Sequence, residues 1–282
     1  VRETLAIVAQ DGTVRREAVD DAVANASMVV TTAETRTELA AERLDGVREA
    51  AAAAPEQSFV SGRVENFAAR LDTIEDRADD LGDAIREVLK RTDDGDLYEI
   101  ARRIRRVTNA ATDVQRAADD FQSEVDAFEA WLADADRRVE ELGADLDAIR
   151  ESVDELERIP GALGTDDTGP DRDAGAEWAA ATVRHRVVSL LITDLEAELE
   201  AVRTLADGDR ESPPADFERR LDDVRTSNAA VGERLAARAE PEWVDRFDDR
   251  LDALDDALDD MRPPVAPGDV EAVVSEHRPT VE

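Results

Sequence analysis

Apolar residues recur along this chain at alternating steps of three and four positions. The longest such series runs from Leu97 to Leu156 without a break. Because these steps place side chains on one face of a helix, the series predicts one continuous helix over residues 96–159. At about 1.5 Å per residue that helix is about 90 Å long, too long for a single compact globule. Its apolar stripe consists of Leu97, Ile100, Ile104, Val107, Ala111, Val114, Ala118, Phe121, Val125, Phe128, Leu132, Ala135, Val139, Leu142, Leu146, Ile149, Val153 and Leu156.

Shorter stripes predict the other helices, and turn-forming or helix-breaking residues separate them. We expect Thr13 to cap the helix that follows it. The longest loop is expected between Pro160 and Gly175. The helices expected besides the long one cover residues 1–9, 13–54, 59–91, 176–206, 215–239, 242–261 and 268–277. The stripes of 13–54 and 59–91 are Val19, Val23, Ala26, Val30, Ala33, Thr37, Ala40, Leu44, Val47, Ala51, and Val60, Val64, Phe67, Leu71, Ile74, Ala78, Leu81, Ile85, Val88.

The lengths of the breaks indicate which helices lie side by side. The short turn at 92–96 folds helix 59–91 back antiparallel on the long helix, pairing positions whose numbers sum to 185, such as Leu81 with Ile104. Across the longer loop at 160–175, helix 176–206 is expected to pair with the long helix at positions whose numbers sum to 334, although a shift of seven residues is possible there. The sequence therefore predicts an all-α fold. It is expected to be an elongated antiparallel helical bundle or coiled coil, in which two bundles, 1–125 and 126–282, share the central helix of about 60 residues.

The charge balance indicates the solvent of this protein. Asp and Glu number 70 against 35 Lys and Arg, with Lys90 the single lysine, and the net charge is −35. Such acidity is typical of disordered chains, but the strong apolar periodicity argues against disorder. A dense carboxylate surface with little lysine indicates a protein of an extreme halophile, because concentrated salt screens its self-repulsion.

No run of apolar residues approaches the length of about 18 that a membrane span needs, and no signal peptide pattern is present. We therefore expect a cytoplasmic protein. The chain opens at Val1 rather than at Met, in the middle of a helical pattern, so we expect upstream residues to be missing. The absence of Cys excludes disulfides and thiolate chemistry within this sequence.

Two stretches match the pattern DDxxD, at Asp79–Asp83 and Asp255–Asp259. Helical isoprenoid synthases use two such motifs to hold Mg²⁺ and a diphosphate. In a chain this rich in Asp, such matches arise by chance. The residues Leu81 and Leu258 inside them fall on apolar stripes, and no basic cluster follows to hold a diphosphate. We interpret both stretches as solvated acidic faces.

One basic run stands out, at Arg102, Arg103, Arg105 and Arg106. With the sum of 185, Arg103 and Arg106 approach Asp79, Asp80 and Asp83 of the preceding helix. Interhelical ion pairs of this kind select partner and orientation in coiled coils. The alternative is contact with an acidic partner or a nucleic acid.

Two polar residues fall on apolar stripes. His185 is interpreted as a buried residue whose hydrogen bond sets helix register, with a pH or metal role as the alternative. Asn228 is interpreted as a second residue that specifies register. Trp131, Trp178 and Trp243 are interpreted as anchors of the bundle rather than as a ligand cage.

Little catalytic material remains in the sequence. There is no Gly-rich phosphate loop, nucleophile elbow or His-based acid–base pair, so we assign no catalytic, cofactor-binding or metal residues and expect no cofactor and no enzymatic activity. Residues 1–26 could form a small helix-turn-helix. Its second helix carries Arg15 and Arg16 but also Glu17, Asp20 and Asp21, which is poor for DNA.

Five segments of the sequence carry a likeness to known proteins: Val1–Leu5, Asp11–Ala22, Ala133–Arg138, Arg184–Val187 and Glu276–Pro279. They resemble haloarchaeal proteins labelled "halo transducer protein". The resemblance implies kinship with chemotaxis-type transducers, whose cytoplasmic domains are long antiparallel heptad hairpins. The chain lacks the membrane spans of transducers and their hairpin-tip motif rich in Ala, Asn and Glu, so no functional residue is carried over.

Uninterrupted stripes without site chemistry predict a non-enzymatic helical interaction or scaffold protein in the cytosol of a halophilic archaeon. We expect protein partners, and the stripes allow an oligomer. The first alternative is a soluble transducer-like signalling adaptor, for which the Ala-rich helix 13–54 is the best candidate for sliding. A carboxylate–metal enzyme and a nucleic-acid binder are the remaining alternatives.

Overall fold

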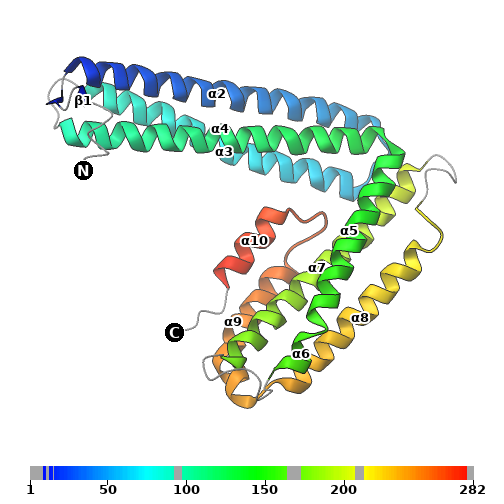
Figure 1. The fold of residues 1–282 in the computed structure, drawn as a ribbon. Coiled ribbons are helices and arrows are strands. Elements are labelled where there is room, and N and C mark those ends of the chain that lie inside the picture. Colours follow the sequence, from blue (N-terminus) through cyan, green and yellow to red (C-terminus); the bar gives the residue numbers. More distant parts are fainter. Residues whose placement is uncertain are drawn as a thin grey trace. The chain divides into compact units, whose positions relative to one another are not determined.

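The computed structural model confirms the all-α fold (Figure 1). It describes residues 9–10, 13–14, 16–91, 97–163, 173–206 and 213–277. Apart from one pair of two-residue strands, the regular elements of these residues are helices. They divide into two compact units, one of residues 1–53 and 64–132 and one of residues 54–63 and 133–282. Most of the predicted helix at residues 1–9 and the predicted turn at 92–96 lie outside the described residues.

The described chain begins with β1 (Ala9–Gln10) and β2 (Thr13–Val14), which pair antiparallel with Ala9 opposite Val14. The prediction that Thr13 caps a helix is therefore wrong, and the helix begins at Arg16 instead. An Asp-Gly pair between two short extended stretches is a strong hairpin signal, and here it outweighs the capping preference of Thr.

The first unit contains α2 (Arg16–Ala53), most of α3 (Ser58–Arg91) and α4 (Leu97–Ala133), which run side by side (Figure 1). Pro55 follows α2 and prevents its continuation. The predicted stripes form the core, since Val30 and Leu44 of α2 and Ile104 of α4 are each at most 3% exposed. Ion pairs Arg36–Asp119 and Arg43–Asp126 show that α2 and α4 run parallel.

An aromatic cluster places α3 along α4. The ring of Phe67 lies 5.8 Å from that of Phe121 and 5.7 Å from that of Phe128, which stacks on Trp131. The predicted sum of 185 would instead put Phe67 opposite Ala118. That register is wrong and α3 lies about one heptad further along, because heptad spacing defines a register only to within seven residues and the large rings pack together here.

The prediction of one continuous helix over 96–159 is also wrong, because the helix is interrupted at one residue. Asp134 adopts an extended backbone and ends α4, and its side chain accepts the backbone N–H groups of Asp136 and Arg137 as the N-cap of α5 (Ala135–Leu156). An Asp at this position satisfies backbone donors that a helix start leaves unpaired. The break adjoins the division between the two units, which falls after Leu132.

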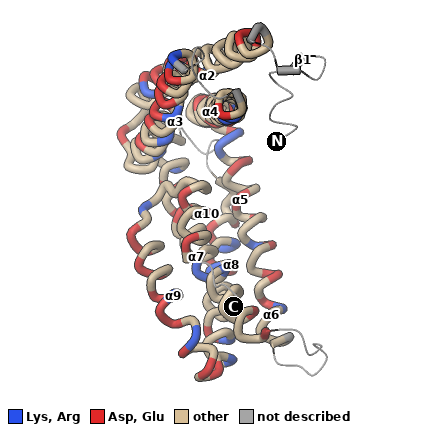
Figure 2. The backbone as a smooth tube through the Cα atoms, turned by 90° about the vertical axis from the view of Figure 1, so that its left-hand side faces the viewer, with Lys and Arg blue, Asp and Glu red and all other residues tan. Residues whose placement is uncertain are grey.

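The second unit contains α5, the short α6 (Ile159–Ala162), α7 (Ala174–Leu205), α8 (Phe217–Arg238), α9 (Pro241–Asp259) and α10 (Pro267–Glu276). The helix α6 occupies part of the expected loop, where Pro160 is tolerated in a first turn. The helix α7 packs on α5, α8 and α9. Asp and Glu outnumber Lys and Arg along α9 (Figure 2). The sum of 334 predicted for α5 and α7 stays a prediction.

Candidate interaction surface

The helix α2 carries a second stripe on the face that points away from its core. Ala24, Met28, Thr31 and Thr35 are all exposed and follow one another at steps of four, three and four. We call these four residues the outer stripe. This spacing is the one that brings a partner helix into contact in coiled coils, but no element of the described chain covers the stripe here.

Large apolar side chains are exposed beside this stripe. Met28 is 65% exposed and Leu39, one turn beyond Thr35, is 46% exposed. Within the described residues the one other exposed large apolar side chain is Leu89 of α3, at 51%. Two of the three therefore lie on the same face of one helix.

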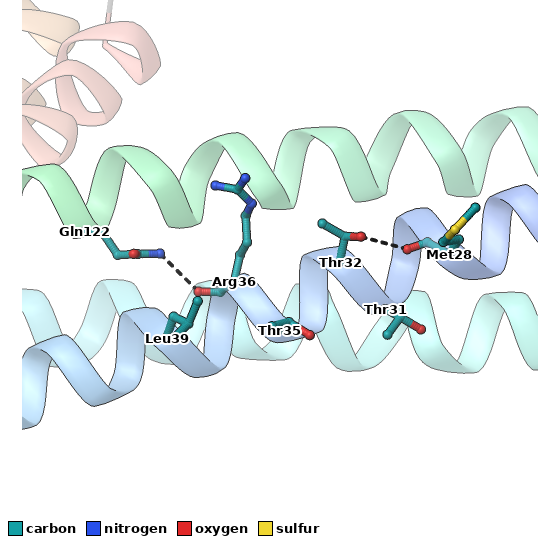
Figure 3. A pocket seen from close by; sticks show the side chains of 7 residues that line it. All are labelled: Met28, Thr31, Thr32, Thr35, Arg36, Leu39 and Gln122. Atoms are coloured by element: carbon teal, nitrogen blue, oxygen red, sulfur yellow. Dashed lines mark hydrogen bonds between the residues drawn. The ribbon is translucent and has the colours of Figure 1, made fainter.

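The two side chains border a shallow hollow of about 540 Å³ between α2 and α4 (Figure 3). The hydroxyl of Thr32 donates to the backbone oxygen of Met28 at 2.9 Å. From α4, Gln122 Nε2 donates to the backbone oxygen of Arg36 at 3.2 Å. The lining is thus mostly methyl and methylene groups; it consists of Met28, Thr31, Thr32, Thr35, Arg36, Leu39 and Gln122.

The surface of this face is almost free of charge. Residues 22–33 form the longest run in the chain without Asp, Glu, Lys or Arg. Arg36, at the edge of the hollow, pairs with Asp119 of α4 and so carries no uncompensated charge. Asp21 and Glu38 bound the outer stripe at its two ends. The uncharged run is the sequence signal that could have identified this surface in advance, although the sequence analysis selected no binding surface.

A polar cluster lies at the interface of α7 and α8. His185 Nε2 is 3.1 Å from the backbone oxygen of Asn228, and since a carbonyl only accepts, Nε2 carries the proton. Burial lowers the pKa of His185, as does the nearby Arg186, while the hydrogen bond to Asn228 and the charge of Asp255 act in the opposite direction. The half-buried imidazole is therefore neutral near pH 7.

Asn228 itself is 4% exposed. Its Nδ2 donates to Ser189 Oγ at 2.8 Å, whereas its buried Oδ1 has no hydrogen-bond donor in the described part of the chain. The interaction of Asn228 with His185 and Ser189 brings the two residues predicted to set register into one cluster. This cluster joins α7 to α8.

The two DDxxD stretches do not form a metal centre in the described residues, where no group of three His, Cys, Asp or Glu is arranged to hold an ion. Asp83 pairs with Arg86 at 2.6 Å within α3. Asp255 pairs with Arg186 at 2.8 Å, and burial raises the pKa of Asp255 despite this partner. One carboxylate of each stretch is therefore already neutralised by an arginine.

The predicted pairing of the basic run is wrong. Arg102 contacts Glu99 at 3.5 Å in its own helix, and no ion pair joins Arg103 or Arg106 to Asp83 within the described chain. The cause is the register of α3 on α4. The acidic residues of α3 lie about one heptad further along α4 than the predicted sum of 185 places them. The two arginines lie half-buried and exposed, respectively, on α4.

The tryptophans serve as packing anchors. Trp131 is fully buried beside Phe128. Trp178 is buried and its Nε1 donates to the backbone oxygen of Leu235 at 3.0 Å, which ties α7 to α8. Its ring centroid is 6.3 Å from that of Trp243 on α9.

A half-buried carboxylate lies beside the segment before α10. Asp194 of α7 accepts the backbone N–H of Val265 at 2.9 Å. Burial raises the pKa of Asp194, and the charge of Asp145 adds to this, whereas the Val265 bond and the charge of Arg63 counteract it. The carboxylate positions this segment.

No protein-family model, curated protein or solved structure matches this chain. Among the helices of the described residues, none is both long and apolar enough to cross a membrane. The surface on α2 therefore has to be interpreted from its own chemistry.

Proposed function

We propose that this chain is a non-enzymatic helical interaction or scaffold protein of the cytosol of a halophilic archaeon, and that it binds its partner through the outer face of α2. The observation that carries the proposal is the exposure of Met28 and Leu39 around one hollow. Grouped apolar exposure on an otherwise polar surface marks binding sites, because leaving it in water is unfavourable.

The acidity of the chain supports the choice of this face. In a cytosol of acidic proteins, two surfaces that meet have to exclude most of their carboxylates from the contact, since like charges directly opposed cost free energy even in salt. The uncharged run 22–33 provides such a face. Thr and Ala side chains allow close approach of a partner helix, and Met28 can adapt its shape to it.

A paired substitution tests this function. The tagged full chain and its variants Met28→Glu and Leu89→Glu are used to capture proteins from a halophile lysate in molar KCl, and bound proteins are quantified by mass spectrometry. We expect Met28→Glu to reduce recovery of the specific partners about tenfold, which corresponds to about 1.4 kcal/mol. Leu89→Glu makes the same chemical change at an exposed position outside the face, and equal recovery with both variants would refute the proposal.

A second candidate, a soluble transducer-like signalling adaptor, is favoured by the packing of α2. Its buried stripe contains small residues such as Ala26, Ala33 and Ala40, whose low relief permits sliding against neighbours. Hydroxyl groups of Ser27 and Thr37 bond back to carbonyls of their own helix, which weakens its preference for one straight conformation. Methylation of specific Glu residues in cells, detected by mass spectrometry, would support this role; its absence under changing stimuli would argue against it.

A further inference from the structure

We propose that the first turns of α4 bind an acidic helical segment of another protein through a group of four arginines. The arginine patch, as we call this group, consists of Arg102, Arg103, Arg105 and Arg106. It is a second surface, on a different helix from the outer stripe of α2, and the inference does not depend on the function proposed for α2.

The arginine patch lies on the side of α4 that faces away from its buried stripe. Ile104 and Val107 of that stripe are at most 6% exposed. Three of the arginines are exposed and Arg103 is half-buried. Residues 100–112 contain no Asp or Glu, so α4 itself places no carboxylate among the arginines. Positive charge is therefore concentrated on one short stretch of a chain whose net charge is −35.

The charges of the patch are only partly neutralised within the chain. Arg102 contacts Glu99 of the same helix at 3.5 Å, and both side chains of this pair are about half exposed to solvent, at 52% and 47%. In the part of the chain that the structure describes, no carboxylate pairs with Arg103 or Arg106. Guanidinium groups therefore remain open to carboxylates from outside.

The charge pattern on the flank of α4 that faces α2 is reversed at the patch. Further along this flank, Asp119 pairs with Arg36 of α2, a separation of 83 residues in sequence. Arg105 takes the same heptad position two heptads before Asp119, and the same separation places it opposite Ala22. The residue on α4 is thus basic here and its counterpart on α2 is neutral, whereas the later position joins the two helices by an ion pair.

The geometry of the patch fits carboxylates that a second helix presents. Arg102 and Arg106 are one helical turn apart, so their Cβ atoms are separated by about 5–6 Å. Two acidic side chains at positions i and i+4 of a partner helix have the same spacing. Each guanidinium can bind a carboxylate through two parallel hydrogen bonds. In molar salt, where the Debye length is about 3 Å, such direct contacts are weakened less than the repulsion between whole acidic surfaces.

The surroundings of the patch favour a short acidic segment over a nucleic acid. The patch covers residues 102–106, which is about 6 Å along the helix axis. Exposed Asp113 and Asp120 follow it along α4. A DNA duplex carries one negative charge per about 1.7 Å of its axis, so a duplex that reached the arginines would also bring phosphates towards these carboxylates. A peptide helix can confine its acidic residues to the one turn that meets the patch.

Fluorescence anisotropy of a labelled peptide tests the proposal with the full chain in molar KCl. The probe is a hydrocarbon-stapled helical peptide of Ala with Glu at positions i and i+4, and the same peptide with Gln in place of Glu is its control. We expect the wild-type chain to bind the Glu peptide more tightly than the Gln peptide. Combining Arg102→Gln with Arg106→Gln should weaken binding of the Glu peptide about tenfold, because two exposed ion pairs are lost.

A second double variant controls for net charge. Arg77→Gln combined with Arg116→Gln removes the same two charges at exposed positions of α3 and α4 outside the patch, and it should bind the Glu peptide as the wild type does. Far-ultraviolet circular dichroism verifies that both double variants keep the helical content of the wild type.

Four results would overturn the proposal. They are no binding of the Glu peptide to the wild type at millimolar protein, equal binding of the Glu and Gln peptides, an equal loss in both double variants, and tighter binding of a DNA duplex that Arg102→Gln with Arg106→Gln abolishes. Met28→Glu should leave peptide binding unchanged. A loss in Met28→Glu would assign the peptide to the α2 face and equally overturn the arginine patch, so failure of this proposal and failure of the proposed function remain distinguishable.

Discussion

Replacing Gly232 by Ala tests whether the polar cluster between α7 and α8 determines their packing. Gly232 lies inside α8, against the ring of His185. A Cβ atom at this position would lie 2.7 Å from Nε2 and 2.8 Å from Cε1 of the imidazole, whereas ordinary contacts begin at 3.4 Å. The ring has to move by several tenths of an ångström, and its bond to the Asn228 carbonyl is then weakened or lost.

The magnitude follows from three opposing contributions. Overpacking of this kind costs about 1–3 kcal/mol, and loss of the His185–Asn228 hydrogen bond costs about 0.5–1.5 kcal/mol. The better helix propensity of Ala over Gly offsets about 1 kcal/mol. We therefore expect Gly232→Ala to lower the free energy of unfolding by about 0.5–3.5 kcal/mol. Gly143 of α5 provides the matched control, because nothing lies within 4 Å of its Cβ position. Gly143→Ala should raise the free energy of unfolding by up to about 1 kcal/mol.

Urea unfolding in molar KCl, followed by far-ultraviolet circular dichroism, measures both changes. His185→Ala combined with Gly232→Ala should recover more than about 1 kcal/mol of the loss, since the clash then has no ring to act on. If Gly232→Ala stabilises the protein as much as Gly143→Ala, the close contact with His185 does not constrain α8 and the reasoning is refuted.

Three further predictions concern charge, salt and one buried bond. Asp194→Asn keeps an acceptor for the Val265 N–H and removes a carboxylate whose pKa is raised by burial despite the charge of Arg63. Because a raised pKa means that the charged form disfavours folding, the variant should be more stable than the wild type at pH 7. This gain in stability should vanish as the pH falls through the pKa of the folded state towards 3.8. Denaturation at a series of pH values measures this, and a gain that persists in acid would contradict it. Transfer from molar to about 0.1 M KCl lengthens the Debye length from about 3 to 10 Å and should reduce helical circular dichroism; an unchanged spectrum would count against the screening argument. Trp178→Phe leaves the buried Leu235 carbonyl without its indole donor and should cost about 1–3 kcal/mol in thermal or urea unfolding, and a smaller loss would show that the bond is dispensable.

The sequence was most informative where the signal is local and periodic. The stripes predicted for α2 and α3 supply core residues such as Val30, Leu71 and Leu81, because a step of three or four positions lies on one face of any α-helix. The signals at single residues were harder to interpret. The heptad spacing of apolar residues continues unchanged across Asp134, although the backbone of Asp134 is extended. The spacing of side chains along a sequence gives no information on the backbone angles of one particular residue.

The candidate surface could be predicted only in part. The uncharged run 22–33 is visible in the sequence, but it contains residues of both the buried stripe and the outer stripe of α2. The spacing is the same for both, so the pattern alone does not say which one faces water. The tertiary structure decides this, because it leaves Val30 only 2% exposed and Met28 65% exposed.

The sequence by itself therefore determined the helical class, the core-facing stripes of α2 and α3 and the acidic charge balance, all of which follow from residue type and period. The tertiary structure decided the register of α3 on α4, through the packing of Phe67 between Phe121 and Phe128. It also decided that His185 and Asn228 meet, and which face of α2 remains uncovered. The physical reason is that heptad periodicity repeats every seven residues, so only the volumes and charges of particular side chains in contact distinguish one alignment from the next.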